Sequence, residues 1–204
     1  HKRNTEAFFD KFYWSYGHAS LADLGVVTNA IESCSALAAI ELEDEPLWNG
    51  QEKSSRYQNF IESGSACVDS PLHKSSYICP SPVVGGPYEP FFHVSIARLQ
   101  DAYRRFLPSV KTALATANPK PVDMKDEDYE RTIQARAFDV VRYFLPLAVR
   151  TSLGQVLTLR VLERQIRRML GSNTEELQDI GKALRDMCGV APDQTWGGLH
   201  GLPP

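Results

Sequence analysis

The chain has 204 residues, of which 43% are hydrophobic and 23% are charged, and its formal net charge at pH 7 is -3. This composition is typical of one globular domain, which we expect to span residues 1–204, and it excludes a largely disordered chain. The small charge argues against general nucleic-acid binding, which needs a basic face that displaces counterions.

Aromatic residues at helical spacing predict a helix in the first segment, NTEAFFDKFYWSYGHAS. Asn4 or Thr5 can cap this helix, and Gly17 is a natural stop. Because His1 stands almost directly before a helix, we expect that an opening strand precedes the given sequence.

The rest of the chain predicts a small sheet followed by long helices. GVVTNAIES indicates a strand from about Val26 to Glu32, and SALAAIEL indicates a helix that Pro46 ends. From residue 64 to residue 90, a composition rich in Ser, Pro and Gly predicts a long irregular connection of the kind that often covers a binding site. Helices are then predicted at 91–117, 127–145, 156–170 and 174–187.

The last of these helices opens with Asn173 and Glu176 at capping-box spacing. The set of elements predicts an α+β fold in which a small, mostly antiparallel sheet is covered by long helices.

The four cysteines are widely scattered, at Cys34, Cys67, Cys79 and Cys188. They show neither a CxxC pair nor a Cys/His spacing, so we expect no metal site and no disulfide framework. Structural, reduced thiols are the expectation. The sequence has neither an apolar run long enough to span a membrane nor a basic-then-apolar leader, so we expect a cytoplasmic protein without a membrane partner.

A dense polar cluster, QEKSSRY, occupies residues 51–57, and two interpretations of it stay open. The first is a solvated turn leading into a strand. The second is a site for an anion and a uracil: Arg56 offers a planar fork for phosphate, Ser54 and Ser55 offer donors, and Glu52 accepts from an N–H or a ribose hydroxyl. A hydrolase nucleophile at Ser54 is disfavoured, because neither a GxSxG elbow nor a neighbouring histidine accompanies it.

The segment from YGHAS to QEKSSRYQNF resembles the core of the flavin-dependent thymidylate synthases. QEKSSRY matches the second half of the family signature in residue type and spacing. YGHAS, with His18 and Ser20, matches the upstream Gly-His-x-Ser/Thr element, and Asp23 stands where the family usually has Glu. Farther along, VVRYFLPLAVRT, with Arg142, resembles the Ala-Arg-x-x-Leu-Pro segment, and TEELQDIGKAL is similar to the closing helix.

The chain also departs from this signature. Residues 44–46, Asp-Glu-Pro, occupy the positions of an Arg-His-Arg triplet that contacts flavin and nucleotide in the family. In TLRVLERQIRRM, Thr158 and Arg164 replace two asparagines. Arg168 lies one residue before the register of a nucleotide-binding arginine, where Met169 stands.

The resemblance implies reductive methylation of C5 of a uracil nucleotide, with methylenetetrahydrofolate as carbon donor, NADPH as reductant and FAD as redox carrier. The nucleotide is dUMP, or UMP as in relatives from nucleoside-antibiotic biosynthesis. Flavin hydride replaces a cysteine nucleophile in this family, which agrees with the scattered cysteines. The resemblance further implies a homotetramer with sites between subunits, for which FFDKFYWSY and the helix at 91–117 could supply interfaces or equally belong to the core.

The resemblance assigns residues to three roles. The catalytic positions are Ser54 and Arg56. The substrate-binding positions are Glu52, Ser54, Ser55, Arg56, Arg142 and Arg168. The cofactor-binding positions are His18, Ser20, Asp23, Leu47, Gln51, Glu52, Thr158 and Arg164.

Other interpretations stay open beside these assignments. Taken alone, His18 is more often a structural hydrogen-bonding residue, and Arg142 a surface or helix-dipole residue. The arginines between Arg160 and Arg168 form either a solvated basic face or an anion site shared between subunits. For the whole chain, the Asp-Glu-Pro replacement motivates a second hypothesis after the active enzyme, a non-catalytic relative that binds nucleotide or serves in assembly. A third hypothesis is another flavin-dependent modification of a pyrimidine nucleotide.

Overall fold

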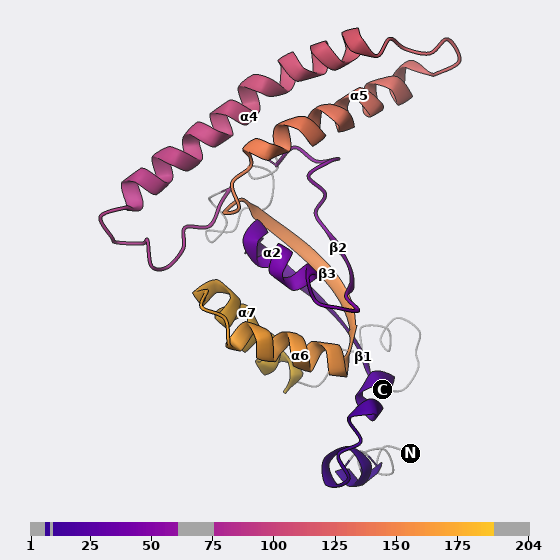
Figure 1. Cartoon of the computed structure of the whole chain (residues 1–204), viewed down its shortest axis with the longest axis vertical. Coiled ribbons are helices and arrows are strands. Elements are labelled where there is room, and N and C mark those ends of the chain that lie inside the picture. Colours follow the sequence, from indigo (N-terminus) through magenta and orange to yellow (C-terminus); the bar gives the residue numbers. More distant parts are fainter. Residues whose placement is uncertain (1–6, 9, 61–75, 190–204) are drawn as a thin grey trace, which may run out of the picture.

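A computed structural model gives the fold of residues 7–8, 10–60 and 76–189; residues 1–6, 9, 61–75 and 190–204 lie outside the described part (Figure 1). Its strands are β1 (Val26–Ser35), β2 (Asn49–Glu52) and β3 (Arg150–Thr158). Its α-helices are α2 (Ala36–Glu43), α4 (Glu89–Ala117), α5 (Asp126–Val141), α6 (Leu159–Leu170) and α7 (Glu175–Cys188). Its shorter helices are η1 (Asp10–Ser15), η2 (Ala19–Leu24) and η3 (Arg142–Phe144).

The three strands form one antiparallel sheet in the order β1-β3-β2. This confirms the predicted small antiparallel sheet and the strand that begins at Val26. The predicted helix at 156–170 is wrong at its start, because residues 156–158 belong to the central strand β3. In β3 the side chains at 151, 153, 155 and 157 are buried in alternation, but two of them are Thr151 and Gln155, so the strand lacks an alternating apolar pattern.

Helices α2, α6 and α7 cover one face of the sheet and share a single apolar core with it (Figure 1). Its buried members are Ile31, Cys34, Ala38, Ala39, Leu42, Leu153, Leu157, Val161, Leu162, Met169, Leu177 and Leu184. A second apolar cluster, of Tyr103, Phe138 and Val141, holds α4 against α5. These two helices form a long antiparallel pair that extends away from the sheet, and we call this pair the arm (Figure 1).

Most of the predicted helices are confirmed with small shifts in their bounds. α2, α4, α5 and α7 lie where the sequence places them, although α5 ends at Val141 and continues as the short helix η3. The described part of the N-terminal segment is helical, with a π-helix at η1, and Gly17 ends it with a φ of 68°. Within the described residues, no helix combines the length and the apolar character needed to cross a membrane.

The predicted capping box at the start of α7 is wrong. Thr174 is the N-cap residue and makes no side-chain cap bond. The Glu176 carboxylate instead accepts hydrogen bonds from the backbone N–H of Ser35 at 2.7 Å and from its hydroxyl at 2.6 Å. Since Ser35 is the N-cap of α2, Glu176 fixes the start of α2 against α7.

We expect the Glu176→Ala variant to lose about 2 kcal/mol of unfolding free energy, because two charge-assisted hydrogen bonds at a half-buried site are removed together. Urea denaturation measures this loss. Glu175→Ala is the matched control, since Glu175 is exposed in the same first turn of α7 and has the same effect on the helix dipole. Equal losses in the two variants would contradict the role given to Glu176.

Candidate functional site

Strand β2 carries the QEKSSRY cluster to the edge of the sheet and ends at Glu52. The next residues form a turn, in which the Ser54 carbonyl accepts from the backbone N–H groups of Tyr57 and Gln58 at 3.4 and 3.2 Å. The Ser54 hydroxyl accepts from the Arg56 N–H at 3.3 Å. The solvated turn therefore describes the backbone of the cluster, but this turn follows a strand instead of leading into one. The side chains of Arg56 and Tyr57 are left exposed.

The turn places Arg56 against the arm. The Arg56 guanidinium donates to Oδ2 of Asp139 through Nε and Nη2, at 3.3 and 3.0 Å. Arg142 approaches the same carboxylate at 3.6 Å. The bond to Asp139, and then its charge, raises the pKa of Arg56. Two guanidinium groups share one carboxylate, so this Arg56–Asp139–Arg142 cluster keeps one uncompensated positive charge, which suits an anionic ligand.

Two further features surround this cluster. Glu52 accepts a hydrogen bond at 2.8 Å from the hydroxyl of the buried Thr151, which fixes one carboxylate oxygen at the end of β2. A groove of about 590 Å³ lies between the turn and the arm. Its lining residues are Arg56, Tyr57, Lys111, Glu130, Arg131, Gln134, Ala135 and Phe138. The groove has the size expected of a small-molecule site.

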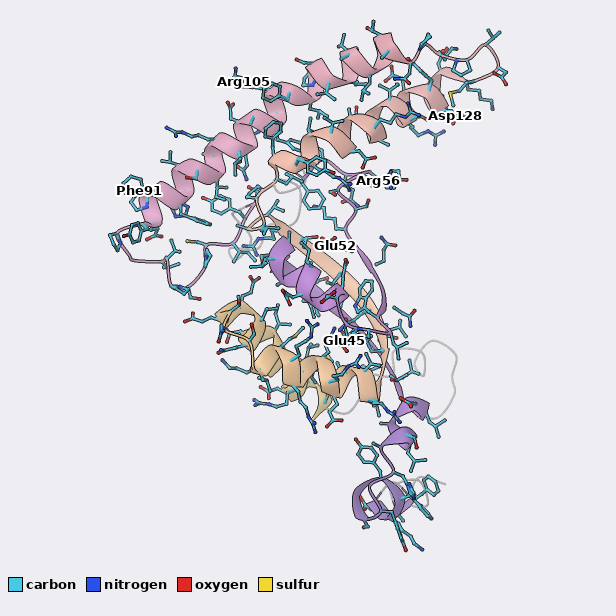
Figure 2. All side chains as sticks on the ribbon, in the orientation of Figure 1. Glu45, Glu52, Arg56, Phe91, Arg105 and Asp128 are labelled. Carbon is cyan, nitrogen blue, oxygen red and sulfur yellow. The ribbon has the colours of Figure 1, made fainter. Side chains whose placement is uncertain are left out.

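Farther back along the chain, Glu45 is a buried carboxylate between two arginines of α6. Its Oε1 lies 2.5 Å from Nη2 of Arg164, and its Oε2 lies 3.3 Å from Nε of Arg168. Arg164 also donates to the Pro46 carbonyl at 2.9 Å, and Arg168 donates to the backbone carbonyl of Glu41. Figure 2 shows Glu45, Glu52 and Arg56 following one another from the α6 side of the sheet to the arm. The arginines that the sequence assigns to ligands are thus paired within the chain.

The remaining arginines of α6 are paired as well. Arg160 lies 2.9 Å from Asp23 of η2, and Arg167 lies 2.6 Å from Glu163. The predicted cofactor-binding Asp23 therefore has an arginine as its neighbour. Because each arginine of α6 has an acidic partner, α6 does not present an uncompensated basic face.

The other predicted cofactor-binding residues have local roles or are exposed. Thr158 is the N-cap of α6, and its hydroxyl accepts from the Val161 N–H at 3.4 Å. His18 stacks on Tyr16 with 6.2 Å between ring centroids. The remaining members of this set, which are solvent-exposed, are Ser20, Leu47 and Gln51.

A buried polar network holds β2 in place. The indole N–H of Trp48 donates at 2.9 Å to the side-chain carbonyl of Gln155, which also pairs with Gln165 and Asn29. The absence of a side chain at Gly50 lets the Trp48 ring and β3 lie close to this strand, because a Cβ there would lie 2.3 Å from the Trp48 ring and 2.5 Å from a backbone oxygen of β3. The position of QEKSSRY thus depends on this network.

A family model described as thymidylate synthase complementing protein matches residues 1–192. The chain belongs to the thymidylate synthase complementing protein family. Two curated relatives are named UPF0159 protein, one from Chlamydia muridarum (strain MoPn / Nigg) and one from Chlamydia pneumoniae. Each is 27% identical over 188 residues, which covers 91% of this chain and 34% of the relative. The chain therefore spans about a third of the length of these relatives.

The fold is similar to that of two crystal structures of thymidylate synthase ThyX from Helicobacter pylori, both described as containing FAD and dUMP. The first has a TM-score of 0.57 at 18% identity and covers 88% of this chain and 75% of that chain. The second has the same TM-score and identity and covers 93% and 79%. These matches confirm the predicted flavin-dependent thymidylate synthase-like α+β fold.

In this member of the thymidylate synthase complementing protein family, two parts of the site were not predicted from the sequence: Asp139 and the role of Glu45. Asp139 precedes Arg142 by three residues on a helix, and this spacing is a local signal for an ion pair. Glu45 carried no such signal, because its arginine partners lie more than a hundred residues away in the sequence.

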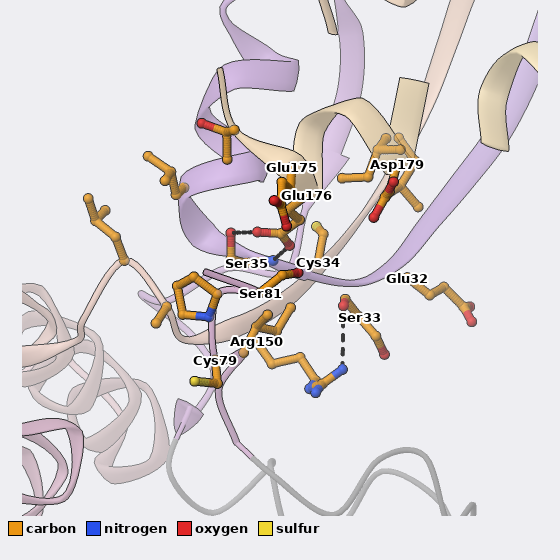
Figure 3. A pocket seen from close by; sticks show the side chains of 18 of the residues that line it. Glu32, Ser33, Cys34, Ser35, Cys79, Ser81, Arg150, Glu175, Glu176 and Asp179 are labelled. Atoms are coloured by element: carbon orange, nitrogen blue, oxygen red, sulfur yellow. Dashed lines mark hydrogen bonds between the residues drawn. The ribbon is translucent and has the colours of Figure 1, made fainter. Parts of the chain in front are cut away.

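A larger cavity in this family member, of about 1080 Å³, lies beside α7, the end of β1 and the loop around Cys79 (Figure 3). None of the site residues predicted from the sequence is among its lining residues. Cys34 lines it, and burial, followed by the charge of Glu176, raises the pKa of its thiol from 9.0 to about 12. The thiols of Cys34, Cys79 and Cys188 are free, and of these only Cys34 is a buried structural thiol; Cys67 lies outside the described residues.

We expect Cys34 to make the folded chain less stable as the pH rises above 9. The unfolded chain releases the thiol proton near pH 9 and the folded chain only near pH 12, so the free energy of unfolding falls by about 1 kcal/mol between pH 9 and pH 10. Urea denaturation of the chain and of Cys34→Ala at both values measures the difference, since the other titrating groups are common to both proteins. Parallel pH dependence of the two would contradict the raised pKa.

Proposed function

We propose that this chain is part of a flavin-dependent thymidylate synthase-like enzyme and holds its uracil nucleotide, dUMP or UMP. The reaction is methylation of uracil C5, with methylenetetrahydrofolate as carbon donor, NADPH as reductant and FAD as redox carrier. The observation that carries the proposal is the convergence of Arg56 and Arg142 on Asp139 in a chain of this family. The ThyX structures of similar fold are described with FAD and dUMP, which agrees with it.

In this proposal the nucleotide phosphate binds at the Arg56–Asp139–Arg142 cluster. A phosphate offers several acceptor oxygens and can take the free donors of both guanidinium groups while Asp139 keeps them in place. The hydroxyl and backbone donors of Ser54 and Ser55 lie in the same turn. Glu52 holds one oxygen against the Thr151 hydroxyl and, with the other, accepts from the uracil N–H or the sugar.

The residues of α6 do not fit a flavin phosphate in their present pairing. Arg164 and Arg168 share the Glu45 carboxylate, and Asp44 adds a further negative charge in the same segment. A phosphate at this place would be repelled by these acids. No reaction step through FAD follows from the residues of this chain, and we propose that other basic groups of the complete enzyme bind the FAD phosphates.

We also propose that the working unit is an oligomer, a homotetramer as the resemblance implies. The predicted site residues of one chain occupy separate places, with Asp23 beside α6 and Arg56 beside α5. A second chain can complete a site that one chain leaves open. Sedimentation of the purified protein tests the tetramer, and a monomer at micromolar concentration would contradict it.

The second candidate function is a catalytically inactive relative that binds nucleotide or serves in assembly. The observation that favours it is the ion pairing of the Glu45 carboxylate with Arg164 and Arg168, which neutralises these arginines within the chain. Under this candidate the nucleotide cluster stays intact and the flavin site is lost.

Titration with dUMP, UMP and FAD separates the two candidates. Calorimetry with each nucleotide should give one site per chain, and Arg56→Ala and Arg142→Ala should each weaken binding 10-fold to 100-fold, since each removes charged hydrogen bonds to phosphate. Arg185→Ala is the control, because Arg185 pairs with Asp186 on α7, away from the cluster. UMP as the preferred nucleotide would indicate nucleoside-antibiotic biosynthesis.

The spectrum of bound flavin and the product mass then decide the activity. Flavin absorbance that tightens with nucleotide, together with a product heavier by one methyl group, supports the enzyme. Nucleotide binding by the full-length protein without any flavin binding supports the inactive relative. If neither dUMP nor UMP binds the wild-type chain, the enzyme and the nucleotide-binding relative are both wrong, and only the role in assembly is left.

A further inference from the structure

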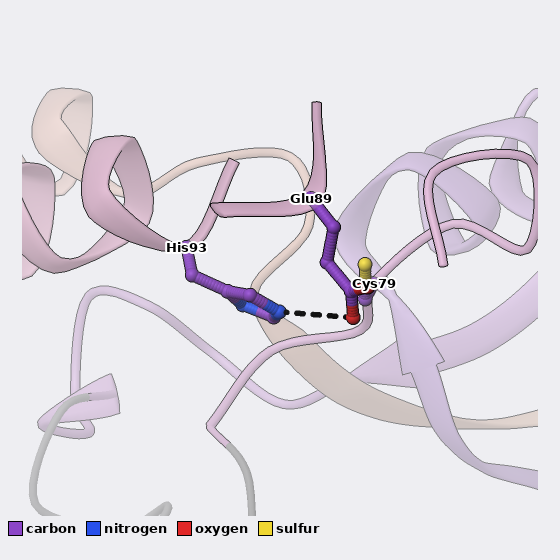
Figure 4. Close-up of side chains that lie close together, drawn as sticks. All are labelled: Cys79, Glu89 and His93. Atoms are coloured by element: carbon purple, nitrogen blue, oxygen red, sulfur yellow. Dashed lines mark hydrogen bonds and ion pairs between the residues drawn. The ribbon is translucent and has the colours of Figure 1, made fainter. Parts of the chain in front are cut away.

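Three metal-ligating side chains meet where the loop after residue 76 reaches the start of α4. They are Cys79, Glu89 and His93, and one ligand atom of each lies within 4.8 Å of the others (Figure 4). All three side chains are half-buried. They are separate from the Arg56–Asp139–Arg142 cluster and from Glu45, so this inference does not rest on the proposed function.

The backbone brings these side chains together from two directions. Glu89 and His93 are four residues apart on α4, a spacing that places two side chains on one helix face. The loop carrying Cys79 is pinned to the chain just before β3: Tyr77 forms a bridge with Val149, and the N–H of Ile78 donates to Ala148 at 2.8 Å. Both sides of the cluster are therefore held by regular backbone contacts.

Glu89 and His93 each have one ligand atom held by a neighbouring group and the other directed toward the cluster. The N–H of Gly85 donates to Oε2 of Glu89 at 2.7 Å, while Oε1 lies 3.4 Å from Nε2 of His93. On the other side of the imidazole, Nδ1 of His93 lies 2.7 Å from the Tyr77 hydroxyl. Metal-ligating histidines usually have their second nitrogen fixed by such a hydrogen bond, which sets the tautomer and the ring orientation.

We propose that Cys79, Glu89 and His93 bind one Zn²⁺ ion, with water as the fourth ligand. A thiolate, a carboxylate and an imidazole together match the ligand preference of zinc, and three protein ligands plus water is a common coordination for it. Ligands about 2.0–2.3 Å from zinc lie roughly 3.5 Å from one another in a tetrahedron. Since the three ligand atoms lie within 4.8 Å of one another, side-chain shifts of about 1 Å would bring them to that separation.

This site departs from the expectation of no metal site, which rested on the absence of short Cys/His spacings. The ligands are spaced C-x9-E-x3-H, so only the folded loop brings the cysteine to the helix. The ion would tie the loop at residue 79 to the first turns of α4. Since Cys79 also lines the 1080 Å³ cavity, the ion would fix one of its walls.

Metal binding to the purified chain tests the proposal. After treatment with a chelator, titration with ZnCl₂ followed by elemental analysis should give one equivalent per chain. Co²⁺ in place of zinc should give a thiolate-to-metal charge-transfer band in the near ultraviolet. We expect Cys79→Ser to remove this band, His93→Ala to weaken zinc binding at least 100-fold, and Tyr77→Phe to weaken it about 10-fold to 100-fold through loss of the histidine's partner.

Cys188→Ser is the matched control, because Cys188 is an exposed free thiol at the end of α7, outside the cluster. It should bind zinc and cobalt as the wild type does. Circular dichroism checks that each variant is folded. The proposal is wrong if the wild-type chain with Co²⁺ has no thiolate band, or if folded Cys79→Ser and His93→Ala bind zinc with unchanged affinity.

Discussion

Replacing Glu45 by alanine is expected to lower the free energy of unfolding by about 2 kcal/mol. The Glu45 side chain is 1% exposed, and its removal leaves Arg164 and Arg168 side by side without their shared carboxylate. Breaking a fully buried ion pair costs about 3–5 kcal/mol, but Arg164 is 53% exposed, so water compensates part of the loss. Urea denaturation at low ionic strength measures the effect.

The control for Glu45 is Glu163→Ala, which removes a carboxylate from the exposed pair with Arg167 on the same helix. This variant should lose less than about 0.5 kcal/mol. Inorganic phosphate provides a second measurement: it should stabilise Glu45→Ala more than the wild-type chain, because Arg164 loses its carboxylate partner and Arg168 keeps only Glu41. If phosphate acts equally on both proteins, Glu45 is not the group that neutralises these arginines.

Replacing Gln155 by leucine is expected to destabilise the chain by about 3 kcal/mol. Gln155 is 1% exposed, and its amide accepts from Trp48 and Gln165 and donates to Asn29 and Gln165. Leucine has nearly the same size, so the loss comes from buried polar groups that remain without partners. The free energy of unfolding from urea denaturation gives the size of this loss.

A double-mutant cycle with Gln165→Leu tests the network directly. The two glutamines exchange hydrogen bonds at 2.9 and 3.1 Å, so the double variant should lose clearly less than the sum of the single losses. Gln58→Leu, at an exposed position of the turn after β2, should change the stability little. Strict additivity of the two buried substitutions would mean that the glutamines do not act as a unit.

Much of the fold could be predicted because most of its elements depend on residues that are close together in the sequence. β1, α2, α4, α5 and α7 follow from apolar spacing, β-branched residues and chain-breaking residues close in sequence. β3 could not be predicted, because it is defined by pairing with strands more than a hundred residues earlier, and Gln155 occupies one of its inward positions. The capping box predicted at α7 was wrong for a similar reason, since the Glu176 carboxylate accepts a hydrogen bond from Ser35, which is distant in sequence.

In the candidate site, too, some features could be predicted from the local sequence and others depend on the fold. The type and spacing of residues in QEKSSRY were compatible with a solvated turn or with a site for an anion, and the fold adds the partner, Asp139, that orients Arg56. The sequence also indicated that Glu45 stands in an unusual place. It could not indicate that this carboxylate is buried against α6, because burial depends on how the loop after α2 packs.

The arm described above has its own apolar cluster, of Tyr103, Phe138 and Val141, separate from the core beneath the sheet. Regions with separate cores often open as independent cooperative units in native-state hydrogen exchange. Asp139 and Arg142 belong to the arm's side of this division and Arg56 to the sheet's side, so the cluster crosses the boundary between two such units. An opening of the arm that moves Asp139 would break the Arg56–Asp139–Arg142 cluster, and a phosphate bound there as proposed would couple the two units by resisting that opening.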